Sequence, residues 1–200
     1  MILLIDCGSM ADPQKNVEMK MRLCFDWMHG RRKTNHISNF YSKYKIREIE
    51  KRDDKSIESV IRSCLIEFGA NHEGTAWADP NLGMFSEIYN SEGNKYWVVE
   101  NEDGQIVGGA GIGQLPGAKD VCELQKMYCL PEVRGTGISH ALMDSALEYA
   151  KKYYTKCYLE TLENMVAAQR FYEKYGFTRT YDVVARTEHF ACDIHYIKEL

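Results

Sequence analysis

The sequence predicts an α+β (mixed α/β) fold, in which helices cover a mostly antiparallel sheet of six to seven strands. The central observation is a strand, a glycine-bearing turn and a helix in succession over residues 122–150. A second is the hairpin pattern of residues 95–115, where two apolar segments flank Glu102-Asp103-Gly104. A third is the order of elements, which requires parallel neighbours only for the strands before and after the central helix. The sheet is therefore not expected to be doubly wound.

Residues 1–44 are predicted to be an extension, helical or partly disordered, ahead of a single domain over residues 45–200. Asp12-Pro13 is a fair start for a helix that ends at Gly30. Residues 1–52 hold 11 Lys and Arg against 6 Asp and Glu, and the remainder holds 14 against 23. The sequence leaves open whether the extension packs on the domain, mediates a homodimer or is disordered.

Alternation, caps and glycine stops predict the elements of the domain in order. Helices are expected to begin at Asp53, at Asp79-Pro80, near Gly137 and at Asn164, with Gly69 and Gly176 ending the first and the last. Strands are expected over residues 44–49, 95–101, 105–115, 121–130, 155–162, 177–184 and 192–197. Gly109, Gly111 and Gly113 fall on one face of a strand and indicate that another group approaches it closely. A structural role is favoured over a ligand.

The turn after the strand of residues 121–130 has the composition of an anion site. Arg134-Gly135-Thr136-Gly137 leads into a helix, and unpaired N–H groups at a helix start bind phosphate. The lysine of a triphosphate-binding loop is absent, and His140 stands where a dinucleotide motif has its third glycine. Taken alone, the pattern also suits an ordinary tight turn.

The composition limits the classes of function. Seven cysteines, an odd number without a C-x-x-C pair, favour a reducing compartment, and no metal-ligand spacing joins them to the six histidines. The apolar run of residues 2–5 is too short for a signal peptide or a membrane span. We expect a cytoplasmic protein without a metal, with neither membrane nor nucleic acid as its main partner. Nucleic-acid binding by the basic triplet Arg31-Arg32-Lys33 remains a weaker alternative.

Two segments carry a resemblance to a known family. LQKMYCLPEVRGTGISHALMDSAL (124–147) resembles motif A of the GNAT acetyltransferase superfamily, R/Q-x-x-G-x-G/A, with Ser139 in the last position. YLETLENMVAAQRFYEKYGF (158–177) resembles its N-x-x-A-x-x-x-Y-x-x-x-G-F helix, at or within one position of the spacing. The segments ADPNL, YWVVE, VGGAGI and CELQKMY look similar to a bacterial subgroup. The family's element order fits residues 45–197.

The resemblance implies an acetyl-CoA site between two splayed strands, with helices on both faces of the sheet. The pantetheine arm and the acetyl carbonyl would lie on the backbone of Met127, Tyr128 and Cys129, and Asn164 would touch the cofactor arm. The pyrophosphate would lie on the turn, whose residues are Arg134, Gly135, Thr136, Gly137, Ile138 and Ser139.

Transfer to an amine also needs a base and an acid. Glu123 is the candidate base, acting through water, and is expected on the same alternating face as Gln125 and Met127. An ion pair of Glu123 with a lysine is an equal alternative. Tyr172 is the candidate acid because the family places a tyrosine there beside the coenzyme sulfur. Cys122 and Cys129 are read as buried small hydrophobic residues rather than nucleophiles.

The leading hypothesis is therefore an acetyl-CoA-dependent N-acetyltransferase acting directly on an amine of a small molecule or a protein. The alternative is a non-catalytic acyl-CoA-binding or sensor module with the same fold. The presence of both Glu123 and Tyr172 favours the enzyme.

Overall fold

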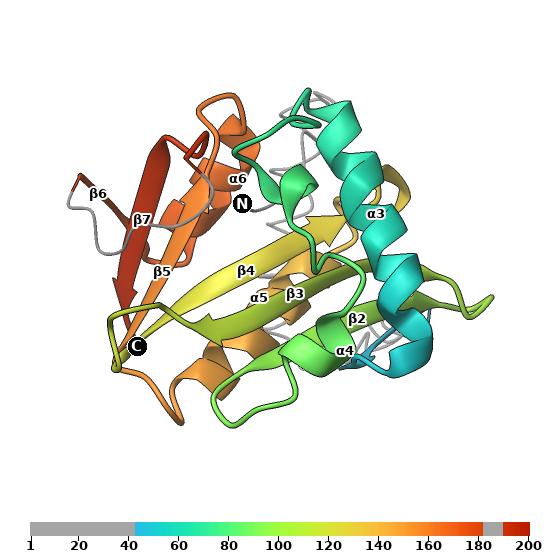
Figure 1. Cartoon of the computed structure of the whole chain (residues 1–200), viewed down its shortest axis with the longest axis horizontal. Helices are drawn as coiled ribbons and strands as arrows, with labels where there is room; N and C mark the ends of the chain where they lie inside the picture. Colours follow the sequence, from blue (N-terminus) through green and yellow to red (C-terminus); the bar gives the residue numbers. More distant parts are fainter. Residues whose placement is uncertain (1–42, 182–189) are drawn as a thin grey trace, which may run out of the picture.

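The computed structural model describes residues 43–181 and 190–200, and these form one seven-stranded sheet with helices (Figure 1). The strand order is β1-β2-β3-β4-β5-β7-β6, and β4 with β5 is the parallel pair. The remaining neighbours are antiparallel. The predicted mixed, mostly antiparallel fold is confirmed. The strands are β1 (Tyr44–Glu48), β2 (Lys95–Asn101), β3 (Ile106–Gln114), β4 (Val121–Cys129), β5 (Lys156–Thr161), β6 (Thr178–Thr180) and β7 (Ile194–Glu199).

Helices cover both faces of this sheet. The described helices are α3 (Asp54–Glu67), α4 (Phe85–Ile88), α5 (Ile138–Ala150) and α6 (Val166–Lys174). Successive strand residues point to opposite faces. On β2 the Tyr96 ring lies 4.8 Å from Phe85 of α4, whereas the Trp97 ring lies 5.5 Å from Tyr149 of α5. Helices α4 and α5 therefore lie on opposite faces, as Figure 1 shows with α3 and α4 in front and α5 behind.

The helix α3, the longest of the described helices, has an apolar stripe on one buried face. Ile57, Val60, Ile61, Cys64 and Leu65 are all buried, as their spacing predicts, and Gly69 ends the helix region with a φ of +65°. Asp53 precedes the helix, but its carboxylate does not cap it. It instead accepts hydrogen bonds from Arg47 and from the backbone of Glu50.

Two predicted helix starts were wrong. The helix expected from Asp79-Pro80 is reduced to the single turn α4, because turns occupy residues 80–83, and Ile88, expected to point inward, is 41 % exposed. The helix expected to be capped by Asn164 begins at Val166, after Met165. The Asn164 amide is not a cap, since it donates to the carbonyl of Phe68 at 3.3 Å.

Parts of the predicted chain lie outside the described residues. The extension of residues 1–44 falls almost wholly in that part, and the strand expected over residues 177–184 is described only as β6 (Thr178–Thr180). Within the described residues, no helix combines the length and the apolar character needed to cross a membrane.

Candidate functional site

The two parallel strands part from each other along their length. Val121, Cys122 and Glu123 of β4 pair with residues 156–158 of β5, but β4 continues to Cys129 without a partner strand on that side among the described residues. Figure 1 shows the two strands diverging beyond this short contact. The backbone of residues 127–129, expected to hold the acetyl arm, lies in the part of β4 that β5 has left.

A β-bulge interrupts β4 in the same part of the strand. Gly111 of β3 faces Gln125 and Gly109 faces Tyr128, so two residues of β4 lie opposite one of β3. Lys126, in the bulge, has a φ of +49°. Because the bulge adds one residue, the alternation reverses beyond it. Tyr128, and not Met127 as expected, shares the face of Glu123 and Gln125.

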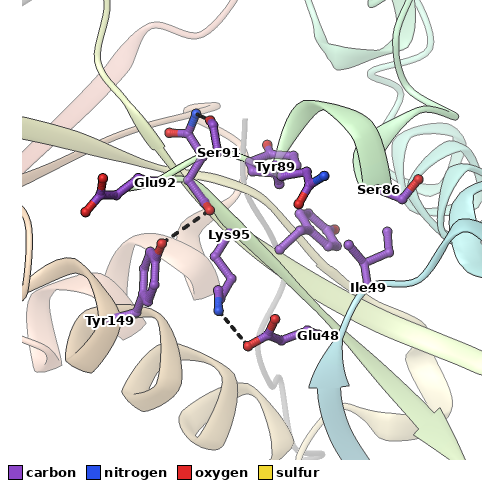
Figure 2. A pocket seen from close by; sticks show the side chains of 11 residues that line it. Glu48, Ile49, Ser86, Tyr89, Ser91, Glu92, Lys95 and Tyr149 are labelled. Atoms are coloured by element: carbon purple, nitrogen blue, oxygen red, sulfur yellow. Dashed lines mark hydrogen bonds and ion pairs between the residues drawn. The ribbon is translucent and has the colours of Figure 1, made fainter.

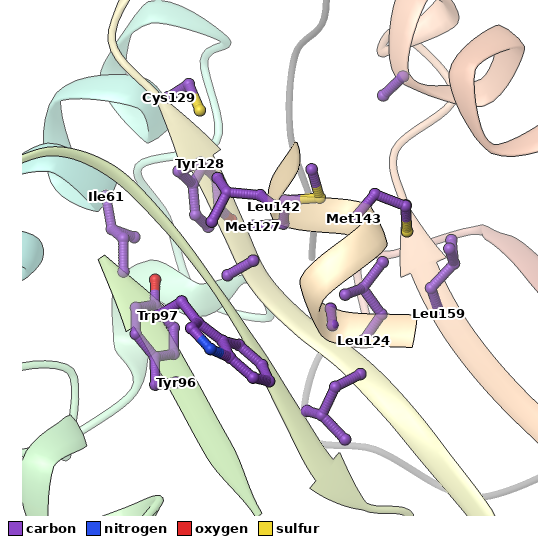
Figure 3. Close-up of a cluster of buried hydrophobic side chains, with 14 of the residues drawn as sticks. Ile61, Tyr96, Trp97, Leu124, Met127, Tyr128, Cys129, Leu142, Met143 and Leu159 are labelled. Carbon is purple, nitrogen blue, oxygen red and sulfur yellow. The ribbon is translucent and has the colours of Figure 1, made fainter. Parts of the chain in front are cut away.

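Met127 instead joins the main hydrophobic core. Its side chain is fully buried, and Figure 3 shows it near Leu142 of the helix α5. The sequence expectation assumed an unbroken alternation through residues 121–130. The inserted residue in the bulge is the physical reason why that expectation was wrong.

The three alternating glycines of β3, here called the glycine face (Gly109, Gly111 and Gly113), make room for two polar side chains. A Cβ on Gly109 or on Gly111 would lie 2.6 or 2.7 Å from the ring of Tyr96. A Cβ on Gly113 would lie 2.6 Å from the amide oxygen of Gln125. The structural explanation of the glycines therefore holds among the described residues.

The Tyr96 ring that crosses the glycine face supports the bulge. Its hydroxyl donates to the carbonyl of Lys126 at 2.7 Å, and the interaction is buried. The Lys126 ammonium lies 2.6 Å from a carboxylate oxygen of Asp79, in the loop before α4. Both ends of Lys126, its carbonyl and its side chain, are thus held by neighbours.

Glu123 belongs to a hydrogen-bonded chain on the same face. The Gln125 amide donates to the Glu123 carboxylate at 2.6 Å, and the Tyr89 hydroxyl donates to the amide oxygen of Gln125 at 2.9 Å. Glu123 is 4 % exposed. Its hydrogen bond comes from a neutral amide, and no lysine is seen paired with Glu123 among the described residues. The predicted role as base remains a prediction.

The turn after β4 presents a run of unused backbone donors. Gly135 and Gly137 have φ values of +73° and +86°, and both are exposed. Among the described residues, nothing accepts a hydrogen bond from the amides of residues 135–139, whereas the amides of His140 and Ala141 donate to Gly137. Five successive amides are thus without a described acceptor at the start of α5, and unpaired N–H groups at a helix start can bind phosphate.

The side chains of this turn are engaged elsewhere. The Arg134 guanidinium makes two bonds of 2.6 Å to Glu67 of α3 and a third, of 3.0 Å, to the carbonyl of Cys129. Ser139 is buried, with its hydroxyl 3.8 Å from the Cys129 sulfur. A phosphate on this turn would therefore meet backbone donors first, and an Arg134 contact would compete with Glu67.

Two buried tyrosine hydroxyls lack partners within the described residues, namely those of Tyr128 and Tyr172. Burial, with smaller contributions from Tyr196 and Cys129, raises the pKa of Tyr172 well above its ordinary range. Burial, with contributions from Cys192, Cys64, Tyr172 and Tyr96, does the same for the pKa of Tyr128. Both are neutral hydrogen-bond donors at pH 7, and the sequence analysis had singled out the hydroxyl of Tyr172 alone.

The thiols near the site are not activated. Burial raises the pKa of Cys129 to about 12 and that of Cys64 to about 11. A thiol protonated at pH 7 is a poor nucleophile. The five described cysteines are all buried without disulfides. Among the described residues, no three His, Cys, Asp or Glu side chains gather into a metal site.

A further acidic residue that the sequence analysis missed, Glu160, lies on the same face of the sheet as Glu123. Glu123 of β4 pairs in register with Tyr158 of β5, and the Tyr158 hydroxyl donates to Glu160 at 2.9 Å. Glu160 is 2 % exposed. Its place two residues beyond Tyr158 puts it on the same face, and the parallel register of β4 and β5 was the signal that could have revealed it.

A separate pocket of about 330 Å³ lies where β1 ends beside β2. Figure 2 shows the Glu48–Lys95 ion pair, 2.6 Å, and the Tyr149 hydroxyl directed to the carbonyl of Asn94. None of the predicted site residues lines it. Tyr89 lies in its wall and connects it with Gln125 through the hydrogen bond described above.

Comparison with known proteins agrees with the fold and with the two motifs. The family model described as acetyltransferase (GNAT) family matches residues 57–177. The uncharacterized N-acetyltransferase YjgM of Escherichia coli (strain K12) is 39% identical over 158 residues, which is 78% of this chain and 94% of that protein. The uncharacterized N-acetyltransferase Mb2688 of Mycobacterium bovis is 33% identical over 132 residues, 62% of this chain and 81% of the relative.

Solved structures share the architecture. A GNAT-family acetyltransferase from Staphylococcus aureus MU50 has a TM-score of 0.70 at 22% identity, over 78% of this chain and 98% of that chain. An acetyltransferase from Streptococcus agalactiae 2603 has a TM-score of 0.68 at 18% identity, over 80% and 100%. These likenesses show the fold. With the family model and the E. coli relative, they establish that this chain belongs to the GNAT family of acetyltransferases.

Proposed function

We propose that this protein is an acetyl-CoA-dependent N-acetyltransferase that moves the acetyl group directly to an amine of a small molecule or a protein. The observation that carries the proposal is the run of free amides at residues 135–139, directly after the part of β4 that β5 leaves unpaired. That pairing of an anion site with an open strand edge suits a ligand that joins a pyrophosphate to an extended amide arm.

The residues of the site would share the chemistry as follows. Backbone N–H groups of β4, at Met127 or Cys129, stabilise the negative charge that develops on the thioester oxygen. Glu123 first takes a proton from the ammonium form of the acceptor through a water molecule. The neutral nitrogen then bonds to the carbonyl carbon and releases its second proton to solvent. The carbon–sulfur bond then breaks, and Tyr172 gives its proton to the departing thiolate. Solvent restores the protonation of both residues.

The state of each group supports its role. Glu123 accepts a hydrogen bond from the neutral amide of Gln125 and forms no ion pair among the described residues. The raised pKa of Tyr172 keeps the phenol protonated, and its hydroxyl has no other described partner. The buried carboxylates Glu123 and Glu160 on one face would favour an acceptor that arrives as an ammonium ion.

The test begins with the purified full-length chain. Calorimetric titration with acetyl-CoA measures binding, and thiol release is then followed over a panel of n-butylamine, ethanolamine, glycinamide, L-lysine amide and 1,4-diaminobutane. We expect binding and amine-dependent thiol release. Binding without release for any amine would favour the sensor module. Salt-dependent binding of DNA that disappears when residues 1–44 are deleted would favour the nucleic-acid alternative.

A further inference from the structure

Tyr128 faces the same side of the sheet as the candidate base. Its register partner is Gly109, and Gln125 and Glu123 face Gly111 and Gly113 of the same alternating row. Without the bulge, Tyr128 would point to the opposite face. The inserted residue therefore decides which side chain of β4 stands next to Gln125 on this face.

The position of the Tyr128 ring is fixed by its neighbours. The carbonyl of Lys126 is bonded to the Tyr96 hydroxyl, and the carbonyl of Cys129 accepts from Arg134 and from the thiol of Cys64. The backbone is thus held on both sides of Tyr128, and the residue is 1 % exposed. A side chain placed so firmly is a good carrier for one oriented hydrogen bond.

The hydroxyl at the end of this fixed ring has no hydrogen-bond partner among the residues that the structure describes. A buried hydroxyl without a partner costs free energy, and phenylalanine would fill the same space without that cost. Buried polar groups in folded proteins are usually satisfied. An orphan in such a place indicates a partner that binds there.

We propose that the Tyr128 hydroxyl binds the acceptor amine. Its oxygen accepts a hydrogen bond from the N–H of the attacking amine, and this bond directs the lone pair of the amine nitrogen towards the thioester. The inference rests on the proposed function. If the thioester lies along the edge of β4, the acceptor amine can approach it from one of the two faces of the sheet. The face of Tyr128 is also that of Glu123, so an amine bound to the Tyr128 hydroxyl lies on the same face as the candidate base.

The charge state of Tyr128 fits this role. Burial raises its pKa well above the ordinary value, so the group stays a neutral phenol while the amine loses its proton to Glu123. The neutral Tyr128 oxygen can accept a hydrogen bond from the amine without competing with Glu123 for the proton of the amine. Tyr172, which belongs to α6, remains free to protonate the thiolate.

The experiment compares Tyr128→Phe with the wild type and with Tyr154→Phe as a matched control. Tyr154 is also buried, but its hydroxyl donates to the carbonyl of Gly93 at 3.1 Å. Each protein is measured for melting temperature, for acetyl-CoA dissociation constant and for kcat/KM of the amine that the wild type turns over fastest in the panel above. The probes are acetyl-CoA and that amine.

We expect Tyr128→Phe to melt no lower than the wild type and to bind acetyl-CoA within about twofold. Its kcat/KM for the amine should fall about tenfold, the loss of one hydrogen bond of ordinary strength. Tyr154→Phe should melt lower and keep kcat/KM within about twofold.

Three results would overturn the inference. Equal kcat/KM in Tyr128→Phe and the wild type would show that the hydroxyl touches no acceptor. A melting temperature lowered as much as in Tyr154→Phe would show a partner inside the protein. An acetyl-CoA constant weakened about tenfold with an unchanged amine KM would assign the hydroxyl to the cosubstrate. A wild type that releases no thiol with any amine would refute the proposed function itself, and this inference with it.

Discussion

The glycine face makes a sharp prediction for the substitution Gly111→Ala. A Cβ at this position would lie 2.7 Å from Cδ2 of Tyr96 and 2.9 Å from Cε1 of Tyr89. Ordinary van der Waals contacts begin at 3.4 Å, so one or both rings must move by about 0.7 Å. Neither ring is free to move, because Tyr96 is bonded to Lys126 and Tyr89 to Gln125.

The expected cost follows from overpacking a well-filled interior. Such substitutions usually destabilise a protein by about 1–3 kcal/mol. For a chain of this size we expect the melting temperature to fall by roughly 2–4 °C for each kcal/mol. The displaced rings also hold the bulge and the amide that bonds to Glu123. Because a misplacement of about 1 Å can cost about 10²-fold in rate, kcat should fall by ten- to a hundredfold.

The control is Gly104→Ala in the hairpin between β2 and β3. Gly104 has a φ of +75°, and a Cβ there would meet nothing within 4 Å. Alanine in this left-handed conformation costs about 1–2 kcal/mol without touching the site. Urea unfolding should therefore show that the two variants have comparable stability. Thiol-release kinetics then show whether their activities differ. We expect Gly104→Ala to keep its kcat.

Two outcomes would refute the reasoning. If Gly111→Ala were destabilised but kept kcat and kcat/KM within twofold of Gly104→Ala, the Tyr89 and Tyr96 rings would not hold the base and the bulge in place. If Gly111→Ala were as stable as the wild type, the rings would have moved at no cost, and the contacts described here would not be rigid.

Three further predictions concern the acid, the turn and the thiols. Tyr172→Phe should lower kcat by at least tenfold at unchanged acetyl-CoA affinity and without loss of melting temperature, because the hydroxyl has no described partner; equal activity would remove its role as acid. Gly137→Ala, at a φ of +86°, should disturb the free amides and weaken the binding of acetyl-CoA but not of S-acetylpantetheine, which lacks the pyrophosphate; calorimetry should show equal losses for both if the turn does not bind phosphate. Burial raises the Cys129 pKa to about 12 from an unfolded value of 9.0, so the neutral thiol stabilises the folded state below pH 9 and this contribution is lost between pH 9 and 12. Urea unfolding across pH 9–10 should therefore show a slope for the wild type steeper than for Cys129→Ala by about 1 kcal/mol per pH unit, and equal slopes would contradict the assignment.

Local patterns in the sequence were sufficient for most elements. The hairpin at Glu102-Asp103-Gly104, the turn at Gly135 and Gly137 and the helix α5 are each specified by residues close to one another, and the structure confirms them. Helix starts were less secure, because Asn164 has the right composition for a cap and still bonds to Phe68, a contact that arises only in the folded chain.

The face of Tyr128 could not be obtained in this way. The sequence reading assumed that side chains alternate between the two faces without interruption over residues 121–130. The bulge appears only when β4 is aligned with β3. The glycine spacing was visible, and so was Tyr96. The hairpin register places Tyr96 opposite Gly111, so a large ring facing a missing side chain was a signal that the sequence held.

The bulge is over-determined, and this argues that it belongs to the chemistry of the site. Lys126 is the one non-glycine with a positive φ among the described residues, a conformation that costs free energy. The Tyr96 hydroxyl on its carbonyl and the Asp79 carboxylate at its ammonium hold it from two directions. Strain of this kind persists where the surroundings enforce it, and such places are commonly functional. Here the strained residue places Tyr128 on the face of Glu123 and sets the course of the backbone expected to hold the acetyl group.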